Sequence, residues 1–354
     1  MLNLRRFYTF EPRRLEKIRK SIVPFPQFRK PSDPITPFTQ LFSRSASRSP
    51  LIFDRGLKRL QRERASKSAS FSAYEYLRQE IADRLSERLL DFRRSFRRAL
   101  DVGAGASNIR RALVRNKLGF GLELLFEIEL SQAMLEYGSR RLPLAETPFR
   151  TLQVVADEEN FLPQLELSGA LSGGLFDLAI SCMSLHWVND LPGTLAQIRA
   201  ALEPGGVFLG AMLGGETLHE LRVSLQLAEE TILGGVGAHV SPMIEFRDAA
   251  GLLSQSGFTL ITIDIDTILV PYPDMVTLMR HLQGMAENNA LSRRRPWLSR
   301  QVLEHAAEIY RDQFQLSKSQ MKSTLASSNE PLPENGEDWI GATFQVVYMV
   351  GWTP

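Results

Sequence analysis

The sequence is poor in the residues from which disulfide frameworks and zinc sites are built. Its 354 residues include one cysteine, Cys182, which excludes an intramolecular disulfide and any zinc site made of several thiolates. The five histidines are scattered without metal-ligand spacing, and no His-x-Asp pair of the kind that ferrous oxygenases use is present. We therefore expect no bound metal, and we expect Cys182, which lies in an apolar segment, to be inert core.

Long apolar runs and several catalytic motifs are lacking too. No run reaches the roughly 18 residues of a membrane-spanning helix, which argues against an integral membrane protein. The chain has no Gly-x-Ser-x-Gly elbow and no Walker phosphate loop. With 44% hydrophobic residues, it can still bury a sizeable core in one large or two modest domains.

Acidic residues are scarce at the beginning of the chain. Residues 1–50 contain eleven Lys/Arg, three Asp/Glu and seven prolines, so they carry +8 and the rest of the chain carries 2 − 8 = −6. A basic, Arg- and Ser-rich beginning without an apolar h-region is typical of an organellar transit peptide and not of a secretory signal. The alternative is a disordered basic arm that contacts nucleic acid or anionic lipid. We predict a mitochondrial transit segment over 1–50 and expect no nucleic-acid partner.

Helices and then alternating strands and helices are predicted for the following part. Apolar side chains recur every three or four residues across 71–92, so we predict a helical cover over 51–95. From residue 96 the pattern predicts a doubly wound α/β domain with a parallel sheet. The predicted strands are 96–102, 121–128, 151–156, 176–182 and 207–213, and the predicted helices between them begin near 109, 131 and 191.

The last third of the chain has a different pattern. Residues 258–270 alternate isoleucine with threonine and aspartate, which predicts a half-exposed antiparallel or edge strand. Helices are predicted over 274–286 and 292–312, a polar loop over 317–338 and a last strand over 343–352. The domain at 96–354 would thus hold a seven-stranded, mostly parallel sheet with a helical insert before the last strand.

A glycine loop, DVGAGAS at 101–107, follows the first predicted strand. In a parallel sheet this loop lies at the carboxyl edge, where ligands bind. Gly103 and Gly105 would let the backbone approach a ligand closely, and Asp101 can accept hydrogen bonds from its N–H or O–H groups. A Gly-x-Gly pair is also found in tight structural turns, so the loop alone leaves both interpretations open.

Acidic residues end the next two predicted strands. Glu129 lies 24 residues past Gly105, where a carboxylate can hold a ribose diol, and Asp157 suits an exocyclic amine. The alternatives are an acid that stabilises a helix N-terminus for Glu129 and an ordinary turn for Asp157. Three acid-tipped strands favour a nucleoside ligand over a pyrophosphate, because carboxylates repel phosphate.

With this loop, these acids, FDLAIS at 176–181 and EPGG at 203–206, the chain resembles class I S-adenosylmethionine-dependent methyltransferases. The block 184–229, which begins SLHWVNDLPGT, resembles more narrowly the mitochondrial complex I assembly-factor methyltransferase-like family. That family is described both as methyltransferases and as a protein arginine hydroxylase. The resemblance extends from IFDR at 52–55 to FQVVYMVGW at 344–352. Members usually carry a third glycine where this chain has Ser107, which either adopts a strained left-handed conformation or caps the next helix.

The resemblance implies the fold, the cofactor and the reaction. It implies a class I fold that binds S-adenosylmethionine through Asp101, Gly103, Gly105, Glu129, Asp157 and Ser181. It also implies a mitochondrial enzyme of complex I assembly that hydroxylates or methylates an arginine of a complex I subunit. Peripheral contact with the inner mitochondrial membrane is compatible with that role. The sequence shows no oxidant for a hydroxylation.

His186, Trp187 and Asp190 follow the fourth predicted strand and are the predicted catalytic residues. An imidazole can act as a base near neutral pH, and a guanidinium substrate pairs with carboxylates and stacks on aromatic rings. The alternatives are a packed loop for His186 and Trp187 and a helix cap for Asp190. On the same chemical grounds, further candidates are Glu216, Tyr272 and Tyr348.

Two other functions remain open from the sequence. One is a malonyl-acyl-carrier or small-molecule O-methyltransferase, whose carboxylate substrate would need a basic residue such as Arg222. The other is a non-catalytic assembly chaperone that keeps the methyltransferase fold. The chemistry of the acceptor pocket distinguishes the first of these from arginine modification.

Overall fold

The computed structural model describes residues 51–119, 121–295, 297–317, 320 and 339–354. The predicted transit segment 1–50 and most of the predicted loop 317–338 lie outside the described residues. Within the described part, no helix is long and apolar enough to cross a membrane. Nor does that part hold a group of three or more His, Cys, Asp or Glu side chains arranged to bind a metal ion.

Seven strands form one sheet in the order β3-β2-β1-β4-β5-β7-β6. The strands are β1 (Arg98–Val102), β2 (Leu124–Glu129), β3 (Arg150–Val155), β4 (Phe176–Cys182), β5 (Leu202–Leu213), β6 (Thr259–Tyr272) and β7 (Ile340–Trp352). The first five pair in parallel, whereas β7 runs antiparallel to both β5 and β6. The predicted doubly wound, mostly parallel sheet is confirmed, and β6 is the antiparallel edge strand that its alternating sequence predicts.

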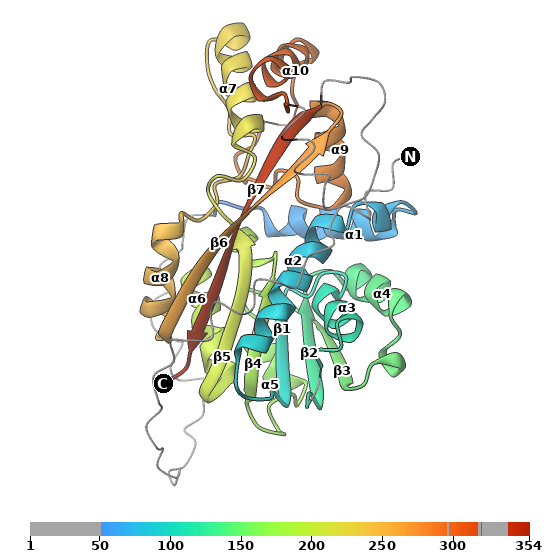
Figure 1. Ribbon diagram of the computed structural model, residues 1–354, viewed down its shortest axis with the longest axis vertical. Helices are drawn as coiled ribbons and strands as arrows, with labels where there is room; N and C mark the ends of the chain where they lie inside the picture. Colours follow the sequence, from blue (N-terminus) through green and yellow to red (C-terminus); the bar gives the residue numbers. More distant parts are fainter. Residues whose placement is uncertain (1–50, 120, 296, 318–319, 321–338) are drawn as a thin grey trace.

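Helices cover both faces of this sheet (Figure 1). They are α1 (Arg55–Lys67), α2 (Tyr76–Glu87), α3 (Asn108–Arg115), α4 (Gln132–Arg141), α5 (Leu162–Leu167), α6 (Leu191–Ala201), α7 (His219–Leu233), α8 (Phe246–Gln255), α9 (Met275–Gly284) and α10 (Arg300–Phe314). Neighbouring residues of a strand point to opposite faces, so Ile180 packs in the core beneath α2 and α3 and Ala179 in the core beneath α5 and α6. The apolar face of α9 and α10 belongs to the first of these two cores.

Helix α1 has a polar buried face, which is unusual for a helix on a core. Asp54 caps it by accepting a hydrogen bond from the Leu57 amide at 2.9 Å. Its fully buried residues include Lys58 and Arg62, and a buried charge requires partners. In Figure 1, α1 crosses the end of the central strands below α9. The contacts described below place it over the carboxyl edge of the sheet.

Two predicted helices differ from the observed ones. The segment predicted as a helix over 292–312 becomes helical only at Arg300, where Ser299 caps α10. The residues before it pair with the chain near Ile52 instead, because the Ser292 amide donates to the Ile52 carbonyl at 2.8 Å. The predicted helix over 71–92 is a shorter α-helix, α2, with a 3-10 turn at each end, Phe71–Ala73 and Arg88–Asp91.

Candidate functional site

The glycine loop turns sharply at the end of β1. The amides of Gly103 and Ala104 both donate to the Ile128 carbonyl at 2.9 Å, which ties the loop to β2. Gly103 and Gly105 have φ of +77° and +57°, values that favour glycine. Ser107 adopts the same left-handed conformation with φ of +56° and does not cap α3. The capping interpretation of Ser107 is therefore wrong, because its hydroxyl is used to donate to Glu127 Oε2 at 3.0 Å.

Asp101 lies at the centre of this edge and is fully buried. Neither of its carboxyl oxygens has a hydrogen-bond partner among the residues that the structure describes. Burial, together with the charges of Glu127 and Glu129, raises the pKa of Asp101 well above its ordinary value. A buried carboxyl group without partners is costly, so this position suits a ligand that brings a positive charge or N–H donors.

The two glycines make close approaches within the chain itself. A Cβ on Gly103 would lie 2.2 Å from the Ser184 side chain, and a Cβ on Gly105 would lie 3.2 Å from Arg78 Nη1. Ser181, beside the loop, donates its hydroxyl to the Val102 carbonyl at 2.7 Å. The loop therefore leaves no room for a larger residue at Gly103, and at Gly105 a larger residue would press against Arg78.

Gly103→Ala should destabilise the protein more than backbone strain alone explains. Gly205 is the matched control, because its φ is +74° and no atom lies within 4 Å of the position that a Cβ would take. Gly205→Ala should cost only the strain of a left-handed alanine, about 1–2 kcal/mol. Gly103→Ala adds the clash with Ser184, which we expect to cost a further ~1–3 kcal/mol. Urea unfolding of both variants measures the difference in the free energy of unfolding. Equal losses in the two variants would contradict the close approach of Ser184 to Gly103.

As the sequence predicts, Glu129 is the last residue of β2 and Asp157 lies just after the end of β3. Each of them binds an arginine. Glu129 is buried and accepts from the Gly105 amide at 2.8 Å, the Ser131 amide at 3.0 Å and Arg62 Nη1 at 2.8 Å. Asp157 accepts from Arg55 Nη2 at 2.7 Å. The bond to Ser131 also shows that Glu129 contacts the beginning of α4.

Two arginines of α1 and one buried glutamate form a charged cluster that sequence reasoning missed. Arg62 is bonded to Glu158 Oε1 at 2.9 Å as well as to Glu129, and Arg55 pairs with Glu158 as well as with Asp157. Burial disfavours the ionised form of Glu158, but the two guanidinium groups outweigh it and hold its pKa well below the ordinary value. The acidic tips of the strands thus explain the buried arginines of α1, whereas Lys58 donates to the carbonyls of Ala286 at 2.9 Å and Asn288 at 3.2 Å.

Glu287, which follows α9, is the second residue that sequence reasoning missed. It is buried and accepts from Trp187 Nε1 at 2.7 Å, His186 Nε2 at 3.0 Å and Arg78 Nη2 at 2.6 Å. Burial opposes its ionisation, but the hydrogen bond from His186 and the charge of Arg78 hold its pKa below the ordinary value. Burial lowers the pKa of His186, so at neutral pH we take the imidazole as neutral, with its Nε2–H donated to Glu287.

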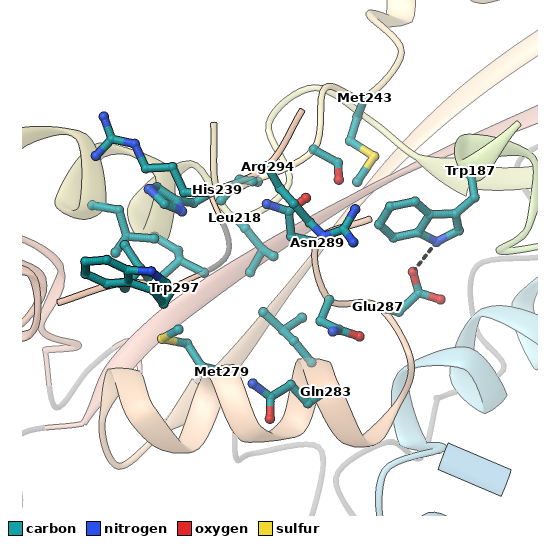
Figure 2. Close-up of a pocket in the computed structure, with 18 residues that line it drawn as sticks. Trp187, Leu218, His239, Met243, Met279, Gln283, Glu287, Asn289, Arg294 and Trp297 are labelled. Atoms are coloured by element: carbon teal, nitrogen blue, oxygen red, sulfur yellow. Dashed lines mark hydrogen bonds between the residues drawn. The ribbon is translucent and has the colours of Figure 1, made fainter. Parts of the chain in front are cut away.

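A cavity of about 300 Å³ opens beside Trp187 and Glu287 (Figure 2). Figure 2 shows α9, which carries Met279 and Gln283, along one side of it, and Trp297 at the end far from Trp187. Its apolar walls are Leu218, Leu221, Leu225, Met243, Met279, Leu282 and Leu298. Two lining acceptors, Ser241 Oγ and Asn288 Oδ1, are buried and have no hydrogen-bond partner within the described part of the chain.

The cavity adjoins the glycine loop. Arg78 donates to Glu287 from one nitrogen, and its other terminal nitrogen lies 3.2 Å from where a Cβ of Gly105 would be. Trp187 belongs to the turn that follows β4, and Lys58 of α1 lies 3.3 Å from the centroid of its ring. The cavity is therefore linked to the glycine loop through Glu287 and Arg78.

Of the predicted catalytic residues, Trp187 lines the cavity and His186 contacts Glu287 behind it. Asp190 is exposed and caps α6, with its Oδ1 accepting from the Gly193 amide at 3.0 Å. The capping role is the one that the geometry supports for Asp190. The other residues named for a guanidinium or carboxylate substrate, Glu216, Tyr272, Tyr348 and Arg222, do not line this cavity. Cys182 is buried, and burial raises its pKa to about 12, as expected of inert core.

Two signals in the sequence could have drawn attention to the missed residues. Lys58 and Arg62 stand four residues apart and so share one face of a helix, with Gln61 beside them. Glu287 ends the segment YPDMVTLMRHLQGMAE, which the resemblance to the family already covered. Neither signal predicts which residue is the partner, because the partners lie far away along the chain.

The chain is similar to several known proteins. The methyltransferase domain family matches residues 74–308. The mitochondrial arginine-hydroxylase NDUFAF5 of Danio rerio is 41% identical over 303 residues, which cover 86% of this chain and 83% of that protein. A malonyl-[acyl-carrier protein] O-methyltransferase of Halorhodospira halophila is 31% identical over 230 residues, 64% of this chain and 71% of that protein. The solved structure of Bacillus subtilis YcgJ is 13% identical, with a TM-score of 0.45, and the match covers 76% of this chain and 97% of that one.

Proposed function

Because this chain belongs to the family of the mitochondrial arginine-hydroxylases NDUFAF5, with a methyltransferase domain, we propose that it binds S-adenosylmethionine and modifies an arginine side chain. The observation that carries the cofactor assignment is Asp101, a buried carboxyl group without partners in the described part of the chain, beside a left-handed glycine loop. A cationic cofactor would supply the positively charged partner that Asp101 lacks.

The donors of S-adenosylmethionine match the acceptors at this edge. Its ammonium group suits Asp101, its ribose diol suits Glu129 and its adenine amine suits Asp157, since each of these side chains accepts hydrogen bonds. Ser181 would hold the loop through its bond to Val102. When bound, the cofactor supplies an electrophilic methyl group on a sulfonium ion. The residues of this chain bind and orient it.

The cavity beside Trp187 suits an arginine side chain. A guanidinium has five donors and no acceptor, and Glu287, Ser241 and Asn288 offer acceptors to it. The leucine and methionine walls suit the methylene stem. Glu287 would hold the charge, Trp187 would flank it, and His186 would act as a positioning residue that fixes Glu287 through its Nε2–H.

A carboxylate substrate, as in a malonyl-acyl-carrier O-methyltransferase, is the second candidate. Arg294 and Arg295 line the cavity and favour it. Both are already paired, however, Arg294 with Asp54 at 3.4 Å and Arg295 with Glu229 at 3.0 Å. Arg222 donates to the Gly215 carbonyl. We place arginine first because Ser241 Oγ and Asn288 Oδ1 line the cavity as acceptors without a hydrogen-bond partner in the described part of the chain.

Mitochondrial localisation follows from the family. We propose in addition that residues 1–50 are a transit segment, that the substrate arginine belongs to a complex I subunit, and that the enzyme meets it in the matrix or at the inner membrane. N-terminal sequencing of the mature organellar protein tests the first point, and recovery of an intact beginning would count against it.

Binding of the cofactor is tested by thermal unfolding of the purified protein. S-adenosylmethionine or S-adenosylhomocysteine should raise the melting temperature, because a ligand of the native state stabilises it. Asp101→Asn should keep the fold and lose this shift, because the amide cannot balance the ammonium charge. Asp177→Asn, at the other end of the sheet, where the carboxylate accepts from the Arg97 and Arg98 amides, should keep it. A wild-type shift in Asp101→Asn would show that the cofactor binds elsewhere.

A further inference from the structure

Arg62 occupies a special place in the charged cluster. Its side chain is 3% exposed, and its guanidinium bonds to residues at or just beyond the carboxyl ends of three strands, β2, β3 and β4. Nη1 donates to Glu129 at 2.8 Å and to Glu158 at 2.9 Å, and Nη2 donates to Ser184 Oγ at 2.9 Å. The carboxyl ends of β2, β3 and β4 are thus bridged by one cation. This cation lies where a ligand of a parallel sheet is expected.

The carboxylates at this edge can bind only some of the functional groups of the proposed cofactor. Asp101, Glu129 and Asp157 accept hydrogen bonds, so they suit its ammonium, diol and amine groups. The methionine portion also carries a carboxylate, which acidic residues repel and which needs a cation or N–H donors. Arg55 is committed to Asp157, to Glu158 and to the Trp187 carbonyl. Arg62 is the other buried guanidinium of this cluster.

We infer that Arg62 binds the α-carboxylate of the cofactor's methionine portion and gives up Glu129 in exchange. This inference rests on the proposed cofactor. In the exchange Arg62 replaces one carboxylate partner by another, and Glu129 is released to accept from the ribose diol. Glu129 keeps the Gly105 and Ser131 amides as partners, and Glu158 keeps Arg55.

The charges of the ligand explain why such an exchange leaves Arg62 paired. Removing one partner from a buried ion pair is strongly destabilising, because it leaves an uncompensated charge. Here the ligand brings a carboxylate for Arg62, which stays paired, and an ammonium for Asp101, which gains the hydrogen-bond partner that it lacks. Glu129 exchanges Arg62 for the neutral diol and keeps its two amide donors. A guanidinium and a carboxylate also form two parallel hydrogen bonds, which sets the orientation of the methionine portion.

The test compares two ligands that differ only in the carboxylate, S-adenosylmethionine and decarboxylated S-adenosylmethionine. Their dissociation constants are measured by calorimetry with wild type, Arg62→Met, Arg62→Lys and Arg59→Met. Wild type should prefer the carboxylate-bearing ligand by about 10- to 100-fold, as expected for a hydrogen bond between charged groups. In Arg62→Met this preference should fall to within about threefold, and Arg62→Lys should be intermediate.

Arg59→Met is the matched control, since Arg59 lies on the same helix, is 56% exposed and pairs with Glu63. It should keep the wild-type preference. Because the preference is a ratio measured in one protein, a general loss of stability in an Arg62 variant does not mimic the effect.

Several outcomes would overturn the inference. If Arg62→Met keeps the wild-type preference, another group binds the carboxylate. If Arg62→Met binds both ligands more tightly by the same factor, Arg62 only competes for Glu129. A wild type that binds both ligands equally well overturns this inference and leaves the cofactor assignment standing. A wild type that binds neither overturns the cofactor assignment, and this inference with it.

Discussion

Glu287→Gln should abolish modification of the substrate arginine while the protein still binds its cofactor. The glutamine removes the negative charge that we assign to the guanidinium and that also pairs with Arg78, yet its amide oxygen can still accept from Trp187 and His186. Loss of one member of a buried charge pair at a binding site typically costs about 2–5 kcal/mol, which corresponds to roughly 30- to 4,000-fold in kcat/KM. Mass spectrometry of complex I peptides from organelles that carry the variant measures the modified fraction directly.

Asp190→Asn is the control for this experiment. Asparagine is as good a helix cap as aspartate, and Asp190 caps α6 away from the cavity, so this variant should modify the arginine normally. If Asp190→Asn loses the modification and Glu287→Gln keeps it, the acceptor site lies on the other side of Trp187. If complex I assembles fully on Glu287→Gln with its arginine unmodified, the modification is dispensable and the chaperone function gains support.

Glu158→Ala should be among the most destabilising single substitutions in the protein. Glu158 is fully buried and shared by Arg55 and Arg62, so its removal leaves two buried cations with fewer partners. Breaking a buried ion pair from one side costs about 3–5 kcal/mol. Urea unfolding at neutral pH measures the loss. Glu63→Ala, which removes the partially exposed pair with Arg59, should cost no more than about 1 kcal/mol.

Wild type and Glu158→Ala should also differ in how their stability depends on pH. The folded-state pKa of Glu158 lies below its unfolded value, so its contribution to stability is fully present above that unfolded value, about 4.3. The contribution is lost as the pH falls towards the folded-state pKa. Wild type should therefore lose stability on acidification more steeply than Glu158→Ala, and the gap between their unfolding midpoints should narrow below about pH 4. A gap that stays constant from about pH 7 to pH 3 would show that folding does not lower the pKa of Glu158.

The strands and the acidic edge could be predicted because their signals are local. The alternation of isoleucine with polar residues in β6 reports a half-exposed strand directly, since successive side chains point to opposite faces. Asp101 and Glu129 could be placed at one edge because the carboxyl ends of parallel strands meet there. Ser107 could not be settled, because a left-handed serine and a capping serine have the same local sequence.

The partners of these acids were decided only by the tertiary structure. Arg62 meets Glu129 across 67 residues of sequence, and Arg78 meets Glu287 across 209. No periodicity relates such positions, because the contact arises when α1 and the segment after α9 are packed onto the finished sheet. By itself, the sequence determined the α/β domain, its family and the acids at the carboxyl edge of the sheet. The structure alone decided which cations meet those acids and which carboxylate lines the acceptor cavity, because buried charges find their partners through packing and not through spacing along the chain.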